Sequence, residues 1–313
     1  MNGIKRFLTV LCIAGCGGGG GGGAGTHEDA DPGNSMVDGS QAGQDGMGSN
    51  QNPGDAIQVT TGNDHCASAA TISLAAMHSD ISATTAGATA DLAAPCGTVG
   101  TPDVFFTFAL TRRELVYADT FGSSGTTALY FASSCQVART ASTTPGDAVC
   151  STGACGTSQS QVVALLDPGT HYLVYAGQGA AMIHFRHVEV GSGSVTLLPS
   201  GSSTATGTTS STGFGSLYAC DAGGAENSYW WMTCAGDLGG AFSGSTCGGI
   251  TNFDTMLSLQ MPGTESTMCD DDTCLMQSTV TANIPAGAGL YVISVDGFST
   301  ARHGDYTLTT SRP

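Results

Sequence analysis

Residues 253–308 read FDTMLSLQMPGTESTMCDDDTCLMQSTVTANIPAGAGLYVISVDGFSTARHGDYTL. Short alternating apolar runs are separated here by turn residues, which predicts a strand, an acidic loop and three further strands. The first half of the chain repeats this plan with TALYFASSC at 127–135 and SQVVALLDPGTHYLVYAG at 160–177. Each copy has two cysteines five positions apart, and a tyrosine, Tyr172 or Tyr291, follows the second cysteine by seventeen positions. A repeated β unit is therefore the main feature of the sequence.

The repeat extends upstream, because Cys96 and Cys220 each lie nine residues before an aromatic pair. Helical periodicity is not sustained, and frequent Gly, Ser, Thr and Pro interrupt the apolar runs. The sequence therefore predicts an all-β fold with two tandem antiparallel β-sandwich domains, at residues 57–199 and 200–313. The second copy lacks a match for residues 63–66 and is expected to lack its first strand. In the first domain, strands are expected at 69–74, 104–110, 115–119, 128–132, 161–165, 171–176, 182–190 and 194–198.

The charge balance is strongly acidic, with 25 acidic residues, eight basic residues and a formal net charge of −17. Such a surface cannot neutralise phosphate groups, so we expect no nucleic-acid partner. The acidity suits an exported protein that stays soluble and attracts cations.

The N-terminus predicts export. Lys5 and Arg6 precede the apolar run 7–14, which is too short to span a bilayer and is typical of a signal peptide. Ile13-Ala14-Gly15-Cys16 resembles the cleavage box of bacterial lipoproteins. That resemblance implies a signal peptide at 1–15, lipidation of Cys16, and anchoring to a membrane, with the outer membrane expected. The alternative is an ordinary signal peptide with an incidental cysteine.

A disordered, Gly-rich tether is expected at residues 16–56. The segment contains an unbroken glycine run at 17–23 and almost no large apolar side chain. It cannot bury enough surface to offset its chain entropy.

Five segments together resemble the pre-peptidase C-terminal domain and its relatives in myxobacterial secreted and lipid-anchored proteins. They are NDHCASAATI at 63–72, PDVFFTF at 102–108, STCGGITNFDTMLSL at 245–259, CDDDTC at 269–274 and GLYVISVDGFSTARHGDYTL at 289–308. The resemblance covers most of residues 60–313 in two copies. It implies a jelly-roll-like sandwich that sometimes binds calcium or matrix polymers such as collagen. Family members usually accompany a secreted protease, which is missing from this sequence.

Ten cysteines remain beyond Cys16, five in each copy, and an exported chain favours disulfides. Their spacing lacks the CxxC pairs and partner histidines of a zinc site. The expected pairs are Cys66–Cys96, Cys150–Cys155, Cys234–Cys247 and Cys269–Cys274. Cys135 and Cys220 remain, and they form a bridge between the domains or rearrange the local pairs.

The acidic loop is a candidate calcium site. Asp270, Asp271 and Asp272 repel one another unless solvent or a cation screens them. Calcium takes six to eight oxygen ligands, and Asp254 and Asp296 are further candidates. The alternative is a solvated acidic turn, because no EF-hand spacing exists. Copy one has no equivalent aspartates, so any such site belongs to copy two.

The aromatic cluster Tyr229-Trp230-Trp231 is a candidate surface for stacking against sugar rings, with Tyr229 and Trp231 on one face. The alternative is that alternate residues belong to the core, as the equivalent pair Phe105-Phe106 indicates. Trp230 would then face the opposite way from Trp231, and at least one ring is expected to be partly exposed.

Motifs for catalysis are absent, since the sequence has no GxSxG elbow and no HExxH. His184 and His187 would lie on opposite faces of one strand, which argues against a shared metal. We therefore expect a non-catalytic, lipid-anchored adhesion or binding protein with a surface protein or polysaccharide as partner. The alternative is a carbohydrate- or matrix-binding accessory module. A hydrolase with a site between the domains comes third, and it requires His171, His184 or His303 beside a Ser and an Asp.

Overall fold

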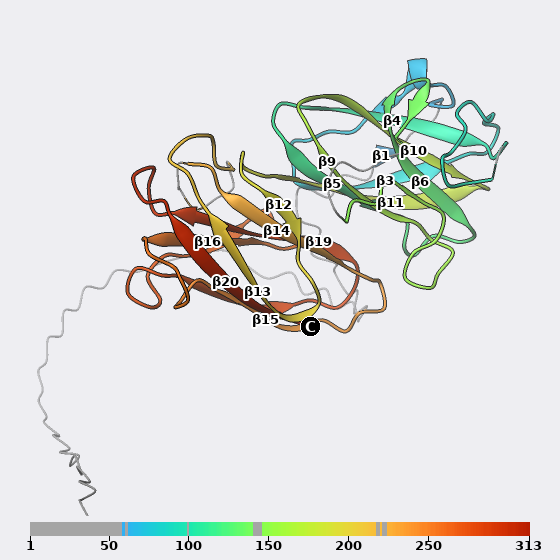
Figure 1. Ribbon diagram of the computed structural model, residues 1–313. Helices are drawn as coiled ribbons and strands as arrows, with labels where there is room; N and C mark the ends of the chain where they lie inside the picture. Colours follow the sequence, from blue (N-terminus) through green and yellow to red (C-terminus); the bar gives the residue numbers. More distant parts are fainter. Residues whose placement is uncertain (1–57, 60–61, 99, 140–145, 217–219, 221–223) are drawn as a thin grey trace, which may run out of the picture. The chain divides into compact units, whose positions relative to one another are not determined.

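A computed structural model describes residues 58–59, 62–98, 100–139, 146–216, 220 and 224–313 (Figure 1). These residues form β-strands, turns and one short 3-10 helix at Cys66–Ser68, which confirms the all-β fold class. The predicted signal peptide at 1–15, the lipidation site Cys16 and the tether at 16–56 lie outside the described residues. No helix in the described part of the chain is long and apolar enough to cross a membrane.

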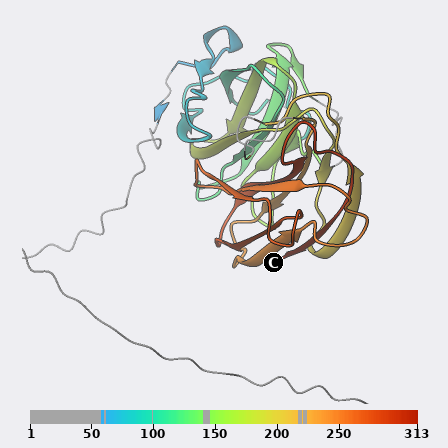
Figure 2. The same ribbon diagram turned by 90° about the vertical axis from the view of Figure 1, so that its left-hand side faces the viewer.

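The first sandwich consists of two sheets, drawn in blue to yellow-green in Figures 1 and 2. One has the strand order β1-β3-β11-β5-β9, and the other has the order β2-β4-β10-β6-β7, with β8 also paired to β6. The strands are β1 Gln58–Val59, β2 Ala70–Thr71, β3 His78–Thr84, β4 Asp103–Leu110, β5 Glu114–Asp119, β6 Thr127–Ser134, β7 Val137–Ala138, β8 Cys150–Ser151, β9 Gln161–Leu166, β10 Gly169–Gly177 and β11 Ala180–Glu189.

The second sandwich repeats this arrangement with the sheets β12-β14-β19-β16-β17 and β13-β20-β15-β18. The order of β2, β4, β10 and β6 matches that of β12, β14, β19 and β16, and the order of β3, β11, β5 and β9 matches that of β13, β20, β15 and β18. The structure thus repeats as the sequence does. The strands are β12 Val195–Leu197, β13 Gly201–Thr208, β14 Asn227–Thr233, β15 Gly240–Ser245, β16 Thr255–Gln260, β17 Thr267–Asp270, β18 Thr279–Ile284, β19 Gly289–Gly297 and β20 Asp305–Arg312.

Four features differ from the sequence prediction. Strand β12, expected to close the first domain, pairs in parallel with β14 and belongs to the second sandwich. It occupies the place that β2 has beside β4, so the second copy does not lack its first strand. The β1–β3, β2–β4 and β12–β14 pairs are parallel, whereas all other pairs are antiparallel as expected. The sequence also gave no prediction for β3, because its outward residues are polar and leave only a short apolar pattern.

Each sandwich has its own apolar core between its two sheets. In the first, Phe106 and Phe108 of β4 point inward, and the intervening Phe105 packs on the outer face of the same sheet. In the second, Tyr229 and Trp231 of β14 point inward. This alternation follows from the period of two along a strand.

A third apolar cluster joins the sandwiches to each other. It contains Leu115, Val163 and Val188 from the first sandwich and Trp230 and Val292 from the second. Trp230 is fully buried there, on the opposite side of β14 from the second core. A buried tryptophan removes roughly 150–250 Å² from water, so this contact is a substantial part of the tertiary structure.

Polar contacts add to this interface. Glu265 of the second sandwich accepts a hydrogen bond from the backbone N–H of Met77 at 2.9 Å, and its other oxygen lies 2.6 Å from Nδ1 of His78. The amide of Gln161 donates to the carbonyl of Thr233 at 2.8 Å.

Ten cysteines form five disulfides, but none of the four predicted pairs is among them. The predicted pairs Cys66–Cys96, Cys150–Cys155, Cys234–Cys247 and Cys269–Cys274 are therefore wrong. The observed bonds are Cys66–Cys135, Cys96–Cys150, Cys155–Cys234, Cys220–Cys269 and Cys247–Cys274.

The repeat still governs the pairing. Cys96–Cys150 and Cys220–Cys269 are equivalent bonds, each joining the segment before β4 or β14 to a short strand paired with β6 or β16. A cysteine in such a strand bonds to the loop that lies beside it in the fold. The spacing of cysteines along the sequence does not indicate which loop that is. The bond between the sandwiches uses Cys155 rather than Cys135 or Cys220, both of which pair within their own sandwich.

Candidate functional site

The predicted stacking surface does not exist, because Tyr229 and Trp231 are core residues. Their exposed fractions are 4% and 1%. The indole of Trp231 stacks on Phe242 and Tyr291, with ring centroids 5.0 and 4.9 Å apart. The expectation that one ring of Trp230 or Trp231 is partly exposed is also wrong, because the first sandwich covers the outward face of β14.

The five predicted calcium ligands do not form one group. Asp270 accepts hydrogen bonds from the N–H of Thr279 at 2.6 Å and the hydroxyl of Thr273 at 2.8 Å, so its oxygens hold its own loop. Asp254 lies 3.8 Å from the guanidinium of Arg302. Asp271 and Asp272 act on Asp254 through their charge, and burial raises the pKa of that carboxyl.

Asp296 lies on β19, on the other side of β16 from Asp270. Its side chain is buried, and its negative charge helps to raise the pKa of Glu226. Among the described residues, the one group of three potential ligands with all ligand atoms within 4.8 Å is Asp64, His65 and Asp91. This group is largely exposed, and its members bond to one another and to Thr89.

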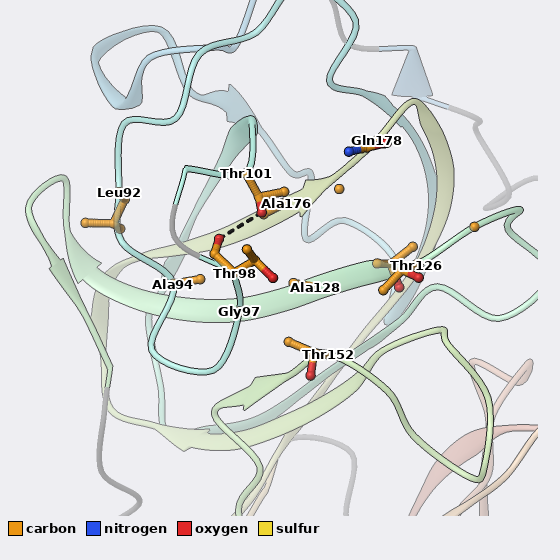
Figure 3. Close-up of a pocket in the computed structure, with 13 residues that line it drawn as sticks. Leu92, Ala94, Gly97, Thr98, Thr101, Thr126, Ala128, Thr152, Ala176 and Gln178 are labelled. Carbon is orange, nitrogen blue, oxygen red and sulfur yellow. Dashed lines mark hydrogen bonds between the residues drawn. The ribbon is translucent and has the colours of Figure 1, made fainter.

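A hollow of about 540 Å³ lies over the outer face of the first sandwich (Figure 3). Its floor includes Ala128 of β6 and Ala176 of β10, and a loop carrying Thr98 and Thr101 forms its rim. The hydroxyl of Thr101 donates to the carbonyl of Thr98 at 2.8 Å, which is drawn as a dashed line in Figure 3. The lining contains no aromatic and no ionisable side chain, so the hollow offers hydroxyl, amide and backbone groups alone.

A second hollow, of about 350 Å³, is lined by residues of both sandwiches, and we call it the cleft. Strands β3, β5 and β11 contribute its ionisable side chains from the first sandwich. The second sandwich contributes small residues and a proline at 235, 262–263 and 287–289.

The ionisable wall of the cleft forms by strand alternation. Asp80 of β3, Asp119 of β5 and His184 of β11 point outward from the first core and line the cleft. In register, Asp80 and Asp119 lie on either side of His184. Nδ1 of His184 lies 2.6 Å from Asp80 Oδ1, and Nε2 lies 3.3 Å from the carbonyl of Phe121.

Contacts and burial shift the pKa values of these groups. The hydrogen bond with Asp80 raises the pKa of His184, and the same bond lowers the pKa of Asp80. Burial raises the pKa of Asp119, whose carboxylate accepts hydrogen bonds from the hydroxyl of Tyr117 at 2.7 Å and the N–H of Phe121 at 2.9 Å. Both ring nitrogens of His184 are thus occupied, and neither contacts a serine hydroxyl.

The most unusual group in the cleft is Arg186. It follows His184 on the same face of β11 and lies opposite His78 and Tyr117 in the sheet register. Its exposed fraction is 3%, and none of its three guanidinium nitrogens has a hydrogen-bond partner among the described residues. Burial lowers its pKa to about 10, against the attraction of Glu265. A guanidinium with this pKa is charged at neutral pH.

The sequence contained part of this site. Alternation predicted that His184 and His187 lie on opposite faces of a strand, and the structure confirms it: His184 lines the cleft, whereas His187 is buried beside Glu114 at 2.6 Å. The same alternation puts Arg186 on the face of His184. The signal was missed because that face was not known to be covered by a second domain.

Comparison with known proteins finds matches among solved structures but not among family models or curated proteins. No family model matches the sequence, and no curated protein matches it. Among solved structures, the chain is similar to a Paenibacillus xanthan lyase at 9% identity and a TM-score of 0.21, over 70% of this chain and 23% of the lyase chain. It is also similar to a protein from Eubacterium rectale described as secreted, at 12% identity and a TM-score of 0.20, over 67% of this chain and 69% of the other. With scores this low, function has to be argued from the residues.

Proposed function

We propose that this protein is an exported, non-catalytic binding protein that holds its ligand in the cleft between its two sandwiches. The five disulfides indicate folding in an oxidising, extracellular setting. Lipidation at Cys16 and the Gly-rich tether would hold the sandwiches at the cell envelope, where a surface polysaccharide or protein is the partner.

A single observation carries the proposal: Arg186 is a buried, unpartnered guanidinium in a hollow of about 350 Å³. Hollows of this size are at the low end of the range for small-ligand sites. Buried polar groups in native proteins nearly always have partners. A site waiting for a ligand explains the missing partner.

The walls of the cleft are held in place before a ligand arrives. The Cys155–Cys234 disulfide links the sandwiches covalently, and Glu265 bonds to Met77 and His78 across the interface. Preorganised walls reduce the entropy cost of binding.

A non-catalytic role is supported by the state of His184. Its ring nitrogens face Asp80 and a backbone carbonyl, so it has no hydroxyl nucleophile to activate. Binding without chemistry is the simplest use of such a cleft.

The test is binding of the purified mature chain to a panel of polysaccharides, neutral and acidic, and to collagen, by biolayer interferometry. Ala235→Trp places a large ring in the cleft, and Leu238→Trp is a matched control at a side chain that is 92% exposed outside the lining. We expect Ala235→Trp to abolish binding and Leu238→Trp to retain it. Binding to no member of the panel, or equal binding by both variants, would overturn the proposal.

A second candidate is a carbohydrate-binding accessory module that uses the Thr-lined hollow of Figure 3. The hydroxyl-rich, uncharged lining of that hollow suits a neutral sugar. Here Thr126→Trp should abolish binding to a neutral glucan, whereas Ala235→Trp should leave it intact.

A further inference from the structure

The guanidinium of Arg186 has five N–H donors in a planar fork and no acceptor within the described protein. Burying a charge without hydrogen bonds is strongly unfavourable. A fold that keeps such a group in a cleft is destabilised by it. The cost is explained if a ligand supplies the acceptors.

The neighbouring carboxylates do not supply those acceptors. Glu265, which attracts Arg186 through its charge, is bonded to His78 and to the N–H of Met77. Asp119 is bonded to the hydroxyl of Tyr117 and to the N–H of Phe121. The charge of Glu265 lowers the cost of burying Arg186. The oxygens of both carboxylates are directed to other donors.

Asp80 and the backbone of two turns are further polar groups of the cleft. Asp80 is 40% exposed and bonds His184 through Oδ1, which leaves Oδ2 able to accept from a ligand hydroxyl. The turns at 262–263 and 287–289 bring backbone close to the cleft without bulky side chains. A ligand that matches both features has one anionic group and several hydroxyl donors.

We propose that the cleft binds the carboxylate of a uronic acid unit in an acidic polysaccharide, with the carboxylate on Arg186 and the sugar hydroxyls on Asp80 and the turn backbone. This inference rests on the proposed function of the cleft. Guanidinium and carboxylate match as a planar, bidentate pair. The size of the cleft restricts the contact to a short part of the polymer.

The charge of the cleft favours a singly charged group over a phosphate. Asp80, Asp119 and Glu265 all lie near the cleft, and the whole chain has a net charge of −17. A dianion would meet more repulsion from these carboxylates than a monoanion does.

The experiment is calorimetric titration of the mature chain with three acidic oligosaccharides, namely oligogalacturonate, oligoalginate and a hyaluronan oligomer. Each is compared with its carboxyl-reduced counterpart, which keeps the sugar ring and loses the charge. We expect at least one acid to bind, with about tenfold or greater loss of affinity on carboxyl reduction. Inorganic phosphate should not displace it.

Variants test the assigned residue. Arg186→Met should lower the affinity for the acidic oligosaccharide by about tenfold or more. Arg186→Lys should keep part of that affinity, because lysine retains the charge but lacks the planar guanidinium. Arg112→Met is the matched control, since it removes one positive charge at the ion pair with Glu189, outside the lining of the cleft. Thermal unfolding shows that each variant is folded.

The outcomes separate the two proposals. If reduced and acidic forms bind equally, or Arg186→Met binds as the wild type does while Ala235→Trp does not, the carboxylate assignment is wrong and the cleft remains the binding site. Displacement by phosphate also overturns the assignment. If nothing in either panel binds, both proposals fail.

Discussion

Cys155 of the first sandwich is disulfide-bonded to Cys234 of the second, and their Cα atoms lie 5.7 Å apart. The bond crosses an interface that already contains the buried Trp230 cluster. It therefore restricts the separation of two units that each have their own core.

Replacing this pair by Cys155→Ser/Cys234→Ser should lower the free energy of unfolding by about 2–4 kcal/mol, because the unfolded chain gains freedom. We expect the two sandwiches of this double variant to unfold in two separate calorimetric transitions. Cys247→Ser/Cys274→Ser, a pair within the second sandwich, is the control and should lower only one transition. A single unchanged transition in the first variant would show that the apolar interface alone couples the sandwiches.

Removing the charge of Arg186 should stabilise the unliganded protein. The guanidinium is buried without a hydrogen bond, so Arg186→Met exchanges an unsatisfied charge for an apolar side chain of similar length. We expect the free energy of urea unfolding to stay equal or rise by about 1–3 kcal/mol. A loss of more than about 2 kcal/mol would mean that Arg186 has a structural partner, which contradicts a binding role.

Affinity for an acidic ligand should depend on the protonation of His184. Its ring faces Asp80, Asp119 and the carbonyl of Phe121, and the pKa is raised above the usual value near 6.5. Protonated His184 adds positive charge beside Arg186, so affinity should fall as pH rises through this raised pKa. Titrations between pH 5.5 and 9 should show a several-fold loss, and His184→Gln should remove the dependence. A flat profile in the wild type would exclude the histidine from the site.

The same pair has a defined effect on stability. Asp80 has a lowered pKa, so its contribution is present above its unfolded value and is lost as pH falls through the folded pKa. His184 has a raised pKa, so its contribution is present below its unfolded value and is lost as pH rises through the folded one. The pair therefore contributes most to stability at pH values between the unfolded pKa of Asp80, about 3.9, and that of His184, about 6.5. NMR titration of the histidine ring in Asp80→Asn should show a lower pKa than in the wild type.

Glu226 should destabilise the protein at alkaline pH. Its side chain is fully buried, one oxygen accepts from the N–H of Gly191 at 2.9 Å, and burial raises its pKa to about 7. Since the unfolded value is near 4.3, stability should fall as pH rises through about 7, by roughly 2–4 kcal/mol in full. Glu226→Gln should remove most of this dependence in unfolding experiments at pH 5 and 9. An equal pH dependence in the wild type and in Glu226→Gln would mean that other groups cause it. Asp296, whose pKa is raised by burial, would be the first to test.

Calcium should have little effect on the melting temperature. Asp270 bonds within its own loop, and Asp296 lies on the other side of β16 and accepts from the N–H of Gly297. The measurement is the melting temperature with and without millimolar calcium, for the wild type and for Asp271→Ala/Asp272→Ala. A rise of several degrees that this variant abolishes would contradict our expectation and establish the acidic loop as a site, because a ligand of the native state must stabilise it. Asp270→Ala should be destabilising with or without calcium.

Residues in regular alternation were predictable from the sequence, and residues at contacts between distant segments were not. Phe105 and Phe106, like Trp230 and Trp231, alternate with a period of two, which places neighbouring residues on opposite faces of a strand. Trp230 follows the same period, but its burial depends on the first sandwich. The burial of Arg186 likewise depends on what covers β11.

The sequence by itself determined the repeated all-β plan, the positions of most strands and the use of the cysteines in disulfides, because alternation, turn residues and cysteine content are local properties. The tertiary structure alone decided which cysteines bond to each other and to which sandwich β12 belongs. It also decided where the ionisable face of β3, β5 and β11 meets the turns of the second sandwich. Those features arise from contacts between segments far apart in the chain, and no local pattern specifies which surfaces meet.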